Sequence, residues 1–134
     1  MKKIIMILIA VLMLVSRPPR AHASDCDVDR GPCVAVTGRT EVTLDISPKP
    51  VKAMKELFFV VTVRGANVRG PLLLELSMPG MYMGRNEVAL KRSPEGSFSG
   101  RGVIPRCPTG GKLWQADLTI PGTGRLTYRF HVDR

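Results

Sequence analysis

Apolar and polar residues alternate with a period of two along most of the chain after Cys33. Successive side chains of a β-strand point to opposite faces, so this alternation predicts strands with one face in a core. Residues 57–63 are apolar at nearly every position, which predicts a central strand buried on both faces. The residues expected to face the core are Val42, Leu44 and Ile46; Leu57, Phe59, Val61 and Val63; Leu72, Leu74, Leu76 and Met78; Trp114, Ala116, Leu118 and Ile120; and Leu126, Tyr128, Phe130 and Val132.

Clusters of proline and glycine separate these segments at intervals of roughly a dozen residues. Further short strands are expected at 87–91 and 97–104, and the second contains Gly100 and Gly102, which mark a bulge or the close approach of another backbone. No amphipathic helical window of useful length occurs. About seven or eight short strands predict an all-β fold, an immunoglobulin-like antiparallel β-sandwich with Trp114 as its core anchor.

The first residues have the pattern of a secretory signal peptide. Lys2 and Lys3 precede an apolar run of 12 residues, Ile4–Val15, and small residues at Ala21 and Ala23 predict cleavage after Ala23. A membrane-spanning helix needs roughly 20 apolar residues, so a retained anchor is disfavoured. We expect residues 1–23 to be the signal peptide, 24–38 an N-terminal segment and 39–134 the β-sandwich domain of a periplasmic or secreted protein with no transmembrane segment after cleavage.

Charge and motif content disfavour two broad function classes. Four of the 20 basic residues precede the cleavage point, so the net charge falls from +9 to +5, and the remaining basic residues are scattered. They form no basic run with interleaved aromatic residues, so nucleic-acid binding is not expected. Catalysis is also disfavoured, because His131 is the sole histidine after the signal and lies in no recognisable nucleophile motif. Asp27 and Asp29 are interpreted as part of a salt-linked, solvated turn.

Export places the three cysteines where disulfides persist. Cys26 and Cys33 flank a polar loop with a Gly-Pro turn, and we expect them to form a disulfide. Cys107 is then unpaired, which is compatible with a reactive thiol, an intermolecular bridge, a metal ligand or a small buried hydrophobe. The prolines and glycines around Cys107 predict a loop and favour an accessible thiol.

Three methionines lie within six residues in the segment Ser77-Met78-Pro79-Gly80-Met81-Tyr82-Met83-Gly84. Thioether and thiolate ligands are soft and select Cu(I) over harder ions. If the residues after Gly80 are extended, Met81 and Met83 point to one side, and Met78 folds back across the turn. Met78, Met81, Met83 and Cys107 therefore form a candidate Cu(I) site. The alternative is that Met78 and Met81 pack into the rim of the sandwich while Met83 covers an apolar patch.

The order of several short motifs resembles the YtkA-like family, whose members are relatives of FixH. The motifs are Met78-Pro79-Gly80-Met81, Val88-Ala89-Leu90, Gly96-Ser97-Phe98, and Gly110 before Trp114-Gln115-Ala116. The resemblance covers about two-thirds of the chain after the signal. It implies an exported or membrane-tethered immunoglobulin-like sandwich, and the FixH link implies copper handling during assembly of respiratory oxidases. Cys107 and the lack of a histidine near Met78 depart from the family pattern.

Two non-enzymatic functions remain. The first is a periplasmic Cu(I)-binding or copper-trafficking factor that uses the methionine turn and Cys107 and delivers copper to a partner. The second is a metal-free accessory domain of the cell envelope that binds a protein partner, since methionine is also common at adaptable binding surfaces. The first predicts Cu(I) uptake that protects the thiol, and the second predicts none.

Overall fold

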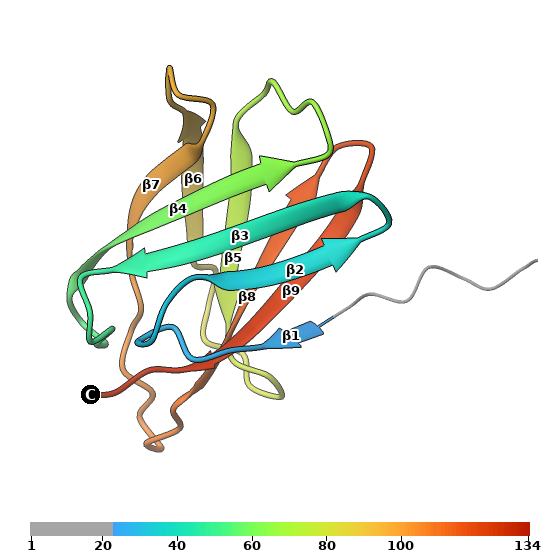
Figure 1. Cartoon of the computed structure of the whole chain (residues 1–134). Coiled ribbons are helices and arrows are strands. Elements are labelled where there is room, and N and C mark those ends of the chain that lie inside the picture. Colours follow the sequence, from blue (N-terminus) through green and yellow to red (C-terminus); the bar gives the residue numbers. More distant parts are fainter. Residues whose placement is uncertain (1–22) are drawn as a thin grey trace, which may run out of the picture.

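The computed structural model describes residues 23–134, and these form an all-β structure (Figure 1). The signal peptide expected over residues 1–23 lies outside the described residues except for Ala23. Among residues 23–134 no helix is long and apolar enough to cross a membrane. The all-β fold class predicted from the alternation is confirmed. The nine strands are β1 (Ala23–Asp25), β2 (Cys33–Thr37), β3 (Thr40–Ser47), β4 (Glu56–Arg64), β5 (Leu72–Ser77), β6 (Glu87–Arg92), β7 (Phe98–Val103), β8 (Leu113–Ile120) and β9 (Gly124–His131).

The strands form two facing layers joined by one strand. Their hydrogen-bonded order is β1-β9-β8-β5-β6-β7-β4-β3-β2, and Figure 1 shows β2, β3 and β4 in front of β5, β8 and β9. Strand β6 pairs with β5 through residues 87–90 and with β7 through residues 91–92, so it passes from one layer to the other. All pairs are antiparallel except β1 with β9, which is parallel and was not predicted.

Glycine at the layer crossing permits a close approach of two backbones. A Cβ atom on Gly100 would lie 2.4 Å from the carbonyl oxygen of Ala89, and one on Gly102 would lie 2.6 Å from a methyl group of Val88. Real Cβ atoms do not approach other atoms so closely. Of the two alternatives, a bulge or a close backbone approach, the close approach is confirmed at Gly100, whereas the space at Gly102 is filled by the Val88 side chain.

The core fills the space between the layers with the side chains that the alternation selected. Trp114 is 1% exposed, and Tyr128 is fully buried, with its hydroxyl donating to the Val42 carbonyl of the opposite layer at 2.9 Å. The expectation for residues 57–63 was wrong in part. Leu57, Phe59 and Val61 are buried, but the opposite face of β4 is open to solvent because no further layer covers it.

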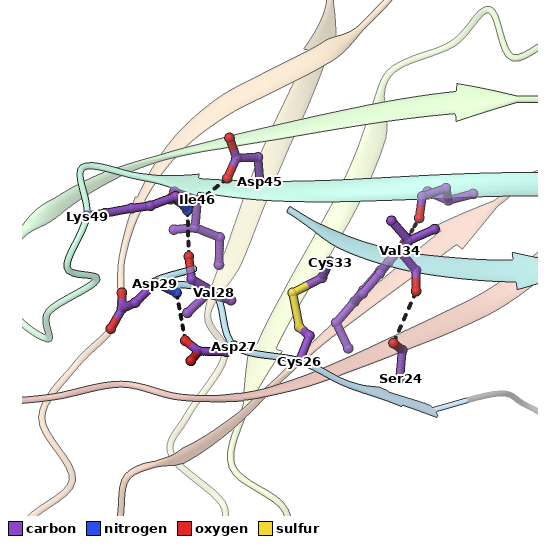
Figure 2. The surroundings of a disulfide bond; sticks show 12 residues. Ser24, Cys26, Asp27, Val28, Asp29, Cys33, Val34, Asp45, Ile46 and Lys49 are labelled. Atoms are coloured by element: carbon purple, nitrogen blue, oxygen red, sulfur yellow. Dashed lines mark hydrogen bonds and ion pairs between the residues drawn. A yellow bond between two sulfur atoms is a disulfide. The ribbon is translucent and has the colours of Figure 1, made fainter. Parts of the chain in front are cut away.

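The Cys26–Cys33 disulfide is present and joins the two ends of the strand order, as Figure 2 shows. Its Cα atoms are 5.7 Å apart, and it links the residue after β1 to the first residue of β2. Next to it, the Ser24 hydroxyl donates to the Val34 carbonyl at 3.1 Å. The open edges of the two layers therefore meet along a seam, which we define as β1, β2 and this disulfide. Of residues 24–38, those of β1 and β2 belong to the sheet and residues 26–32 form the loop between them, whereas position 39 lies in the β2–β3 hairpin turn.

The loop inside the disulfide has the salt-linked form expected for Asp27 and Asp29. Arg30 lies 3.2 Å from the Asp27 carboxylate, which also accepts the Asp29 backbone N–H at 3.1 Å. Asp29 in turn accepts the backbone N–H of Val51 at 2.6 Å. Both carboxylates thus stabilise the fold of the loop, and Lys49 fixes the same loop by donating to the Val28 carbonyl (Figure 2).

Candidate metal centre

The β5–β6 connection begins with a tight turn that folds Met81 back against Met78. Pro79 and Gly80 occupy its central positions, and Gly80 has a φ of +76°, a conformation that glycine adopts without steric cost. The Met81 N–H donates to the Met78 carbonyl at 3.1 Å, and the two residues form an isolated antiparallel bridge. The local sequence Met-Pro-Gly-Met therefore places two thioethers at one end of the sandwich.

The β7–β8 connection lies at the same end of the sandwich as the β5–β6 connection (Figure 1), and Cys107 is part of it. The Cys107 Sγ lies 3.7 Å from the Met81 Sδ and 3.2 Å from the Thr109 hydroxyl. A Cβ atom on Gly111 would lie 3.4 Å from that Sγ and 2.7 Å from the Met78 methyl group, so Met78 packs into the same small space. Met78, Met81 and Cys107 thus converge, and we call these three residues the sulfur cluster.

Cys107 lies in a loop as predicted, but the expected accessibility of its thiol was wrong. Cys107 is 4% exposed and Met78 is 8% exposed, whereas Met81 is 39% exposed. The loop folds inward because Gly111 has no side chain and leaves room for both sulfur-bearing residues. Cys107 is the free cysteine among the described residues, and solvent reaches the sulfur cluster mainly at Met81.

The surroundings of Cys107 favour its thiolate form. The Thr109 hydroxyl is the largest influence and lowers the pKa of the Cys107 thiol. Burial opposes this effect, but the backbone N–H groups of Thr109, Gly111 and Gly110 also lower the pKa, and the net pKa lies below its usual value. A hydrogen bond to the charged form favours that form. The thiolate is the form of cysteine that binds metals, so a lowered pKa is compatible with the ligand role predicted for Cys107.

Met83, the fourth expected ligand, lies elsewhere. It is partly buried against the core and lines an open cleft of about 310 Å³ together with Met81 and Tyr82. Met78 and Cys107 do not line that cleft. The structure therefore brings Met78, Met81 and Cys107 together and places Met83 beside them in the cleft, with Met81 common to both places.

Asp117 is a buried carboxylate in the cleft. The alternation pattern had placed its side chain on the solvent face of the strand. Asp117 is 3% exposed and accepts hydrogen bonds from Gln115 at 2.8 Å, from Arg125 at 2.9 Å and from Thr127. Burial raises the pKa of Asp117, but the hydrogen bonds and the Arg125 charge outweigh it and hold the pKa below its usual value. Thr127 lies directly opposite Asp117 in the β8–β9 register. Pairing of these two strands was therefore the signal that could have identified Asp117 as a hydrogen-bonded, buried carboxylate.

The remaining sulfur and imidazole groups lie apart from the cluster. His131 is exposed on β9, as expected. Met54 is 59% exposed in the connection between β3 and β4, where its backbone N–H donates to the Ile104 carbonyl at 2.8 Å. Within residues 23–134 no group of three or more His, Cys, Asp or Glu side chains is arranged to hold a metal ion.

These features define an all-β sandwich protein that carries a free cysteine enclosed by thioethers at one end. Comparisons of the chain with family models, with curated proteins and with solved structures found no match.

Proposed function

We propose that this protein is exported and binds Cu(I) as cargo at the sulfur cluster, for delivery to a partner in the periplasm or outside the cell. The observation that carries the proposal is the 3.7 Å separation of the Cys107 Sγ and the Met81 Sδ, in a group completed by Met78. Cys107 would supply the thiolate, and the two methionines would supply neutral thioethers. A site with one anionic ligand and two weak ligands suits a carrier that must release its metal.

The spacing of the sulfur atoms supports this assignment. A metal–thiolate bond is about 2.3 Å long, so two sulfur ligands at a tetrahedral angle stand roughly 3.8 Å apart. The observed separation of 3.7 Å is close to that value. Thiolate and thioether ligands select Cu(I) over ions that prefer oxygen, and the lowered pKa of Cys107 increases the fraction of its sulfur that is present as thiolate.

Export is supported by the signal pattern in the sequence and by the Cys26–Cys33 disulfide, because disulfides persist in oxidising compartments. The resemblance of the Met78-Pro79-Gly80-Met81 turn and the Trp114 strand to the YtkA-like family agrees with a copper-related role, and membership of that family stays part of the proposal. The protein acts without catalysis in this account.

The test is an anaerobic titration of the protein starting at Ser24 with Cu(I), against bicinchoninate as a competing chelator. We expect one equivalent of Cu(I) to bind, and Cys107→Ser and Met81→Leu each to weaken it by about tenfold or more. Met54→Leu is the matched control, because Met54 is an exposed thioether outside the cluster, and it should bind as the wild type does. Absence of competitive binding by the wild-type protein, or equal loss in the Met54 control, would overturn the proposal.

A second function, a metal-free envelope domain that binds a protein partner, is favoured by exposed apolar side chains on the outer face of one layer. Val36 is 53% exposed, Val103 is 44% exposed and Phe58 is 40% exposed. The Arg101 guanidinium covers the Phe58 ring at 4.8 Å from its centroid. This function predicts that Cu(I) does not bind and that Met81→Leu leaves partner binding intact. The titration therefore separates the two functions.

A further inference from the structure

Cu(I) binding at the sulfur cluster alone gives no role to the cleft beside it. The cleft holds Met83, and it reaches the cluster through Met81, which touches Cys107 on one side and lines the cleft on the other. Exposure rises along this series from 4% at Cys107 and 8% at Met78 to 39% at Met81. Tyr82, between Met81 and Met83, is 89% exposed at the cleft. A second thioether is thus available where solvent and a partner can enter.

The charges that line the cleft suit a cation. Three carboxylates, those of Glu75, Glu87 and Asp117, face two guanidinium groups, those of Arg85 and Arg125. Arg85 pairs with Glu87, and Arg125 pairs with Asp117 at 2.9 Å and with Glu75 at 3.4 Å. Each guanidinium is therefore held by a carboxylate, and one negative charge is in excess. A monovalent cation at Met83 gains from that excess charge, and the ion pairs keep the arginines from repelling it.

We propose that Met83 and Met81 form the exit route of the site, on which Cu(I) moves from Cys107 and Met78 to the cleft and meets the ligand of an acceptor there. This role rests on the proposed Cu(I) binding and changes the part played by Met83, which becomes a transfer ligand and not a member of the resting site. The acceptor is a sulfur-bearing Cu(I) binder, because a soft ligand is needed to displace a thiolate.

Ligand exchange on this route conserves charge and oxidation state. A copper–sulfur bond to the acceptor forms while the bond to Met83 is in place, and the bond to the Cys107 thiolate breaks. The bonds to the methionines break last, when copper leaves with the acceptor. Copper remains Cu(I) throughout. The acceptor thiol loses a proton as it binds copper, and the released Cys107 thiolate takes up a proton in exchange through the solvent, since metal binding and protonation compete for the same sulfur. Because the entering ligand takes part in the step, the rate should rise with acceptor concentration.

The experiment measures transfer of Cu(I) from the loaded protein to dithiothreitol by stopped flow, over a range of dithiothreitol concentrations, with equilibrium affinity measured in parallel against bicinchoninate. The variants are Met83→Leu and, as the matched control, Met54→Leu. We expect the second-order rate constant of Met83→Leu to fall about tenfold, while its equilibrium affinity stays within about twofold of the wild type. Met54→Leu should match the wild type in both.

Three outcomes would overturn the exit route. A wild-type transfer rate in Met83→Leu would remove Met83 from the route and leave Cu(I) binding intact. A loss of equilibrium affinity in Met83→Leu equal to that in Met81→Leu would make Met83 a resting ligand. A transfer rate independent of dithiothreitol concentration would show that copper leaves before the acceptor enters. Failure of the wild-type protein to bind Cu(I) at all would instead overturn the proposed function, so the two failures are distinguishable.

Discussion

The seam and the sulfur cluster place cysteine in two different surroundings within one small fold. At the seam, Cys26 and Cys33 stand 5.7 Å apart by their Cα atoms, and the disulfide closes the two edges of the strand order. In the cluster, Cys107 has no cysteine beside it and meets the Met81 thioether, the Thr109 hydroxyl and backbone N–H groups. The first setting uses both sulfur atoms in a covalent bond, and the second leaves a free thiol, which the proposed function uses as a Cu(I) ligand.

The carboxylates near each region repeat the contrast. Asp27 at the seam pairs with Arg30 on the surface, where its side chain is 57% exposed. Asp117, in the cleft beside the cluster, is 3% exposed and accepts three side-chain hydrogen bonds. Ion pairs in water contribute little, whereas a buried carboxylate depends on all of its partners. The seam should therefore depend on its covalent bond, and the cleft on its polar network.

Removing the disulfide should have the largest effect on stability. Replacing Cys26 and Cys33 together by serine opens a loop with a sequence separation of 7 residues. Loop-closure entropy predicts a loss of about 2.5 kcal/mol in the free energy of unfolding, which urea denaturation would measure. Cu(I) affinity should not change if the seam and the cluster are independent. A parallel fall in Cu(I) affinity would show that the closed seam also positions the cluster.

Asp117→Asn should have the next largest effect on stability. The substitution keeps the shape but removes the charge that Arg125, Thr127 and Gln115 are arranged to meet. We expect a loss of about 1–3 kcal/mol in the free energy of unfolding at neutral pH. Asp27→Asn is the matched control, because a surface ion pair is worth about 0–1 kcal/mol. Equal losses in the two variants would contradict the contrast between the regions.

The difference in stability between the wild type and Asp117→Asn should depend on pH in a direction set by the Asp117 pKa shift. The pKa of Asp117 is lowered in the folded protein, and an unfolded aspartate has a pKa of about 3.9. The stabilisation by the Asp117 charge is thus fully present above about pH 4 and declines as the pH falls through the folded-state pKa. The gap in stability between wild type and Asp117→Asn should therefore narrow below about pH 4, and a gap that widens in acid would contradict the assigned pKa shift.

The alternation of apolar residues predicted the layers because each strand packs only one face. It identified the inward sets of β3, β8 and β9 and the crossing glycines. It missed β1, since three residues that pair in parallel with β9 leave no periodic signal. It also overestimated the burial of β4, because an apolar outer face does not reveal whether another layer covers it.

Sequence reasoning grouped Cys107 and the methionine turn in one candidate site, but it did not predict how deeply Cys107 and Met78 are buried. Prolines and glycines predict a loop without indicating whether it folds inward. Here the loop folds inward because Gly111, which has no side chain, leaves room for Met78 and Cys107. The position of Met83 in the cleft depends on the path of residues 82–86, which carry no periodic pattern. Asp117 was placed outward because alternation alone ignores partners on the neighbouring strand.

Thr109→Val should have the smallest effect on stability and a diagnostic effect on chemistry. Thr109 is exposed, so the free energy of unfolding should change by no more than about 0.5 kcal/mol. Its hydroxyl is the largest influence lowering the pKa of Cys107, and its removal should raise that pKa, measured by thiolate absorbance of the metal-free protein. Protons then compete better for the sulfur, so Cu(I) affinity should fall at neutral pH and recover as the pH rises.

Thr119→Val is the matched control, because Thr119 is an exposed threonine on β8. A Cys107 pKa that shifts equally in both variants would contradict the role assigned to the Thr109 hydroxyl.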